Sequence, residues 1–245
     1  FGVDVYSSNK VLQKELNSVT WAGFAGGMTV TVGMMPLKKA SAAAFYAVKG
    51  TSLTHGMNKI LLDTSPEDLQ QLNRDKMVEM GVRETVINEF LHNPAYSPRH
   101  KTILVHALAE MQGVKNREQF IKKAIFAEYE EEAFLYQRMA EMLYGYHTHV
   151  KPIKELVPVR KFAVGYTSDQ TVVATFPIDL LYWTELSDLG SAALAKLDLT
   201  GRPIKKTELW FTGTLTPKAM QELSARGLEI KERAGEILMP VAEQE

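Results

Sequence analysis

The chain contains no cysteine among its 245 residues, and neither sign of charge is in clear excess. The absence of cysteine excludes disulfide bonds, thiolate metal sites, iron–sulfur clusters and a cysteine nucleophile. The 28 basic and 29 acidic side chains give a net charge of −1. Proteins that bind nucleic acid concentrate positive charge, so we expect no DNA or RNA partner.

Sequence motifs that would identify a reaction are also missing. There is no glycine-rich dinucleotide-binding or Walker loop, and no Gly-x-Ser-x-Gly elbow to present a serine nucleophile. Hydrophobic residues make up 45% of the chain and charged residues 23%, which are ordinary values for a globular protein. The composition therefore indicates a folded chain and leaves its activity open.

One long stretch has no charge at all. Residues 16–37 include four glycines and are followed by Lys38 and Lys39. The length matches a membrane span of about 20 residues, but the glycines and the alternation of Thr and Val over residues 29–32 favour a glycine-rich turn that leads into a buried strand. We expect the turn and strand. Membrane contact through insertion of residues 19–37 is the alternative.

Signals for the start and end of helices dominate the rest of the first 150 residues. Serine followed by proline, as in Ser65-Pro66 and Ser97-Pro98, is typical of a helix N-terminus. Short connections between helices indicate mostly antiparallel neighbours, as in a bundle. The pattern predicts helices over residues 9–17, 38–49, 63–80, 83–91, 97–111 and 117–144.

Strand patterns appear only after about residue 150, where Pro152 and Pro158 suggest a linker. We predict a β-hairpin from residues 159–167 and 171–177, a helix over 179–197, and a strand–helix–strand unit over 207–232 with a parallel strand pair. The predicted fold class is therefore α+β, with a mainly helical bundle in residues 1–150 and a small α/β region in residues 151–245. The two regions form separate domains or pack as one continuous unit.

The helix predicted over residues 117–144 carries Glu128 and Glu132 on an otherwise apolar face. An unpaired carboxylate in a core costs several kcal/mol, so we expect these glutamates to be paired, protonated or bound to a metal. His106 and Glu110 lie one turn apart on the preceding predicted helix. Histidines and carboxylates on facing helices form divalent-metal sites in bundles. The four residues thus predict a metal site, and a network of salt bridges to arginine or lysine is the competing interpretation.

A second candidate metal site lies at the end of that helix. His147 and His149 are two residues apart. In an extended segment both rings would point to the same side, where they could bind a transition metal. Solvated or hydrogen-bonded histidines are the alternative interpretation.

Taken together, these patterns favour a non-enzymatic binding or assembly protein with a protein partner or a homo-oligomeric state. A metal-assisted enzyme that uses the carboxylate and histidine site is the first alternative, and a peripheral membrane protein is the second. The chain begins at Phe1, which is compatible with removal of a leader or with trimming. This gives a modest preference for the bacterial cell envelope or periplasm over the cytoplasm.

Overall fold

Local capping sets the ends of the first helices. A computed structural model of the chain describes residues 53, 57, 60, 61 and 63–240. The Ser65 side chain accepts a hydrogen bond from the backbone N–H of Asp68 at the start of α3 (Pro66–Glu79), and Ser97 does the same for His100 at the start of α5 (Pro98–Glu110). The shorter α4 (Glu84–His92) lies between them. Three predicted helices are therefore confirmed.

The prediction of a single helix over residues 117–144 is wrong, because this part of the chain forms two helices. These are α6 (Glu118–Ala124) and α7 (Glu130–His149). The Asn93 side chain donates to the carbonyls of Ile125 and Ala127 at 2.8 and 3.0 Å, so side chains outside the helix satisfy the carbonyls at its end. The break is thus stabilised by a residue about thirty positions earlier in the chain.

The N-terminus of α7, which follows this break, is stabilised by acidic residues in its first turn. Three glutamates, at positions 130–132, lie in its first turn, where they complement the helix dipole. The Glu132 carboxylate also accepts a hydrogen bond from the backbone N–H of Glu128 at 2.8 Å. Past this turn most side chains of α7 are buried, and the helix packs against α5 and the sheet.

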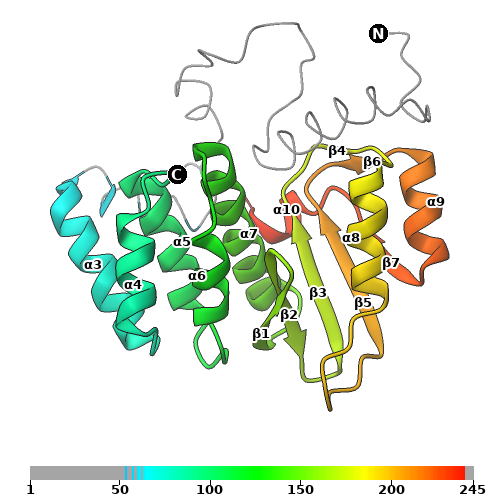
Figure 1. Ribbon diagram of the computed structural model, residues 1–245, viewed down its shortest axis with the longest axis horizontal. Helices are drawn as coiled ribbons and strands as arrows, with labels where there is room; N and C mark the ends of the chain where they lie inside the picture. Colours follow the sequence, from blue (N-terminus) through cyan, green and yellow to red (C-terminus); the bar gives the residue numbers. More distant parts are fainter. Residues whose placement is uncertain (1–52, 54–56, 58–59, 62, 241–245) are drawn as a thin grey trace, which may run out of the picture.

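A five-stranded mixed sheet packs against α7 (Figure 1). Its order is β1-β2-β3-β5-β7. The pairs β1–β2 and β2–β3 are antiparallel, whereas β3–β5 and β5–β7 are parallel. The predicted hairpin and the predicted parallel strand–helix–strand unit are confirmed. The strands are β1 (Ile153–Val159), β2 (Phe162–Thr167), β3 (Thr171–Phe176), β5 (Lys206–Phe211) and β7 (Leu228–Lys231).

The linker predicted after residue 150 is wrong, because residues 153–159 form the edge strand β1. Pro158 is compatible with this strand because an edge strand has one unpaired side and needs no N–H donor there. The predicted strand over residues 159–167 is also divided. A two-residue turn, Arg160-Lys161, joins β1 to β2 where Val159 pairs with Phe162.

The two faces of the sheet are covered by different helices. Side chains of α7 and the short α10 (Gly235–Leu238) share one core with Val173 and Trp210. A second core lies on the opposite face, where α9 (Pro217–Ala225) and α8 (Glu185–Ala195) pack (Figure 1). The helix predicted over residues 179–197 begins only at Glu185, because residues 180–181 form β4, which pairs with β6 (Thr214–Leu215).

The charge-free segment at residues 16–37 lies outside the described residues, as do the helices predicted over 9–17 and 38–49. Within the part that the structure describes, no helix is long and apolar enough to cross a membrane.

Candidate functional site

The structure separates the predicted metal ligands into pairs. His106 Nδ1 lies 3.8 Å from Glu110 Oε1 on α5. Burial lowers the pKa of His106, although Glu110 acts in the opposite direction. Glu128 is exposed in the loop before α7, and Glu132 is half-buried in the first turn of that helix, so the expectation that both project into a core is wrong. Among the described residues no three His, Asp or Glu side chains are arranged to hold a metal ion. The metal site stays a prediction from the sequence without a formed ligand set.

The two histidines near residue 150 are not in an extended segment, because both belong to the last turn of α7. Residues two apart on a helix point to different sides. His147 Nδ1 accepts a hydrogen bond from the backbone N–H of Ile153 at 3.0 Å, and burial lowers its pKa. His147 therefore fixes the connection between α7 and β1, while His149 is exposed.

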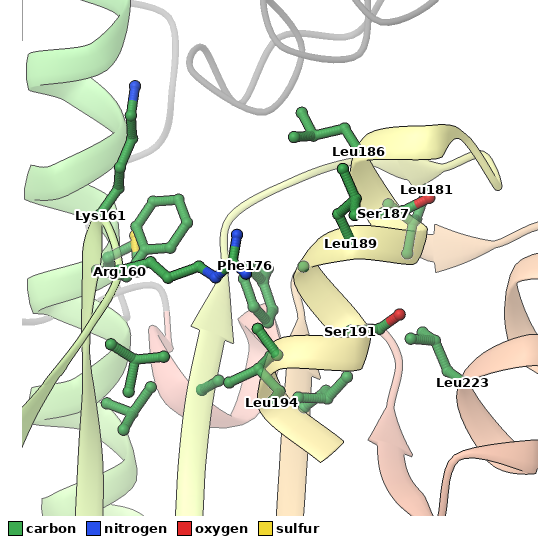
Figure 2. Close-up of a pocket in the computed structure, with 18 of the residues that line it drawn as sticks. Arg160, Lys161, Phe176, Leu181, Leu186, Ser187, Leu189, Ser191, Leu194 and Leu223 are labelled. Carbon is green, nitrogen blue, oxygen red and sulfur yellow. The ribbon is translucent and has the colours of Figure 1, made fainter. Parts of the chain in front are cut away.

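A further candidate site in the described part of the chain is a pocket that the sequence did not indicate. It has a volume of about 580 Å³ and lies between α8 and the adjoining face of the sheet (Figure 2). Binding pockets for small molecules have volumes of roughly 300 to 1,000 Å³ and mainly apolar walls. The sheet side of this pocket is formed by Val159, Val164, Ala174, Phe176, Leu209 and Phe211.

The opposite wall is the apolar face of α8. Leu186, Gly190 and Leu194 follow one another at intervals of four residues and therefore lie on one side of the helix. Leu186 is 40% exposed and Leu189 is 55% exposed, although both line the pocket. The leucines on this side of α8 thus face an open space. We refer to this space as the α8 pocket.

Polar groups of the α8 pocket are few. The hydroxyls of Ser187 and Ser191 donate to main-chain carbonyls of Thr184 and Asp188 at 2.9 and 3.0 Å. Both hydroxyls therefore donate to carbonyls and not to a base that would activate them toward a ligand. The charged residues that line the pocket are Arg160 and Lys161, in the turn between β1 and β2.

The turn that carries these cations is fixed to the bundle. The Tyr136 hydroxyl, on α7, donates to the Lys161 carbonyl at 2.8 Å. Burial raises the pKa of Tyr136 well above its ordinary value, so the hydroxyl keeps its proton. Figure 2 shows the Arg160 side chain extending over the pocket toward α8, and the Lys161 side chain extending away from it.

Two signals in the sequence could have pointed to this site. One is the small pair Gly190-Ser191 in the middle of a leucine-rich helix, which leaves room beside the sheet. The other is the basic pair Arg160-Lys161 between two strands. Neither signal identifies the site by itself, because only the folded structure brings the turn and the helix together.

Comparison of the chain with protein-family models, with curated proteins and with solved structures finds no match in any of the three. The fold and the site define a mixed α/β protein with an apolar pocket between α8 and the sheet.

Proposed function

We propose that this chain is a non-enzymatic binding protein and that the α8 pocket is its ligand site. The observation that carries the proposal is the pocket itself, about 580 Å³ of space between an apolar helix face and an apolar sheet face. The pocket is partly open to solvent, so Leu186 and Leu189 on its wall are 40% and 55% exposed. Apolar walls on both sides of so large a space are what a bound apolar molecule would cover.

The walls support binding more than catalysis. No carboxylate or imidazole is among the described residues that line the α8 pocket, and its two serine hydroxyls are engaged by carbonyls of their own helix. General acid–base chemistry needs a titratable group within hydrogen-bonding reach of the reacting atom. The lining instead supplies contact area, which favours affinity for an apolar ligand.

Gly190 offers a direct test, because a side chain can be added there without distorting the fold. A Cβ atom at this position meets no atom within 4 Å, and the backbone has an ordinary helical conformation. Gly190→Phe would place an aromatic ring on the pocket face of α8. Gly190→Ala, which adds only a methyl group, is the matched control.

The measurement is the fluorescence of an uncharged solvatochromic dye titrated with the full-length protein and both variants. We expect the parent and Gly190→Ala to bind the dye, and Gly190→Phe to bind it at least about tenfold more weakly, since the ring removes contact area. Far-UV circular dichroism checks that each variant is folded. Equal dye binding by folded Gly190→Phe and Gly190→Ala would contradict the proposal, as would absence of binding by the parent.

A further inference from the structure

The charged rim of the α8 pocket indicates what kind of ligand it takes. We infer that the ligand is a single unbranched aliphatic chain with a carboxylate at one end, bound with the carboxylate at Arg160. This inference rests on the proposed function and adds the chemical class of the ligand.

The first argument is charge complementarity. The described lining of the pocket contains two cationic residues and no acidic residue. Arg160 is exposed and takes part in no salt bridge within the described part of the chain. A guanidinium group binds a carboxylate through two parallel hydrogen bonds. An anionic group is therefore the partner that Arg160 fits.

The second argument is the backbone at Arg160. This residue has φ of 49°, in the left-handed region that glycine or asparagine adopts at lower cost in a two-residue hairpin turn. Arg160 is the residue with this conformation that also lines the pocket. With the backbone of the turn in this conformation, the Arg160 side chain extends over the pocket toward α8 (Figure 2).

The third argument is the shape and polarity of the walls. From Leu186 to Leu194 the helix face spans nine residues, or about 12 Å along its axis. Along this length the walls offer aliphatic and aromatic carbon, and the hydroxyls of Ser187 and Ser191 already donate to carbonyls. An extended chain without polar substituents meets these conditions, with its charged end at the turn.

The test is calorimetric titration of the full chain, at neutral pH and low salt, with saturated carboxylic acids of increasing length and with the primary alcohols of the same lengths. We expect each added methylene to strengthen binding by up to about fourfold until the pocket is filled. We also expect the acid to bind more tightly than the alcohol of equal length. Arg160→Gln should weaken binding of the acid by about tenfold and leave binding of the alcohol unchanged.

Two further variants make the result specific. Arg160→Lys keeps a positive charge and should retain part of the preference for the acid. Arg233→Gln removes an exposed arginine that has a similar positive φ of 53° but does not line the pocket, so it should bind like the parent.

The possible failures are distinguishable. If acid and alcohol bind equally, or if Arg160→Gln binds the acid as the parent does, the inference about the carboxylate is overturned while the pocket remains a binding site. If neither compound binds and Gly190→Phe and Gly190→Ala also behave alike toward the dye, the proposed function itself is overturned.

Discussion

His100, in the interior of the bundle, is a residue whose charge state affects stability. It lies on α5, is 8% exposed, and its ring centroid is 5.8 Å from that of Phe134. Its Nδ1 atom is buried with no hydrogen-bond partner. Burial, and secondarily the positive charge of Arg99, lowers the pKa of His100 to about 4. The folded protein therefore holds this imidazole in its neutral form.

This shift predicts a loss of stability in mild acid. The pKa in the folded chain lies below the unfolded value of about 6.5, so protons bind preferentially to the unfolded chain. The contribution of His100 to the free energy of unfolding is therefore complete above pH of about 6.5. It falls by about 3 kcal/mol as the pH drops toward about 4. His100→Gln stays neutral throughout, so urea denaturation should show a weaker dependence of its unfolding free energy on pH.

The matched control is His92→Gln, at an exposed position on α4. It should follow the parent protein across the same pH range. If the unfolding free energies of the parent and His100→Gln change in parallel between pH 7 and pH 4, His100 does not cause the predicted pH dependence of stability.

Packing between elements depends on one glycine of α7. A Cβ atom at Gly145 would lie 1.7 Å from the carbonyl oxygen of Leu238 on α10. That neighbour is backbone and cannot rotate away. Gly145 therefore permits α10 to pack directly on α7, where Leu238 is buried in the larger core.

We predict that Gly145→Ala destabilises the protein by about 2 kcal/mol, because the cost of moving α10 exceeds the helix-propensity gain of about 1 kcal/mol. Gly190→Ala is the opposite case, since its Cβ meets nothing and only the propensity gain remains. It should stabilise by about 0.5 to 1 kcal/mol. Chemical denaturation of both variants checks the signs, and a stabilised Gly145→Ala would refute the packing argument.

The elements that could be predicted from sequence are those whose signals are local. Ser65 and Ser97 cap their own helices, and the strands of the hairpin β2–β3 are adjacent in the chain, so a short window contains the necessary residues. The break between α6 and α7 depends instead on Asn93, which reaches across from another loop. The α8 pocket likewise needs the turn at Arg160 and the helix at Gly190 to meet, which no local pattern specifies.

At the scale of the whole molecule, one core joins the helices to the sheet. The buried cluster contains Leu104 of α5 together with Leu156 and Trp210 of the sheet. The Tyr146 hydroxyl of α7 donates to the Glu208 carboxylate of β5 at 3.2 Å, and Trp210 Nε1 donates to the same carboxylate at 2.9 Å. The helical and α/β regions thus share apolar burial and a buried polar network across residue 150.

Such a shared core predicts a single cooperative unfolding transition for the described part of the chain. Leu104→Ala is the informative change, because Leu104 is fully buried in the helical region. A Leu→Ala substitution in a core costs about 2 to 5 kcal/mol. Far-UV circular dichroism reports mainly the helices. The chain has a third tryptophan, Trp21, so fluorescence is measured in a Trp21→Phe background, where Trp183 and Trp210 report the sheet region. If the two regions unfold together, Leu104→Ala should lower both midpoints by the same amount.

Val78→Ala provides the control, since Val78 is 55% exposed on α3 and its truncation should change neither midpoint by a measurable amount. A Leu104→Ala variant in which the circular dichroism midpoint falls while the tryptophan midpoint stays would instead indicate two independent domains. In a single cooperative unit, the stability lost at Leu104 also lowers the midpoint that the tryptophans of the sheet report. If that midpoint stays, the contacts between Tyr146 and the strand β5 form only a weak interface between two domains.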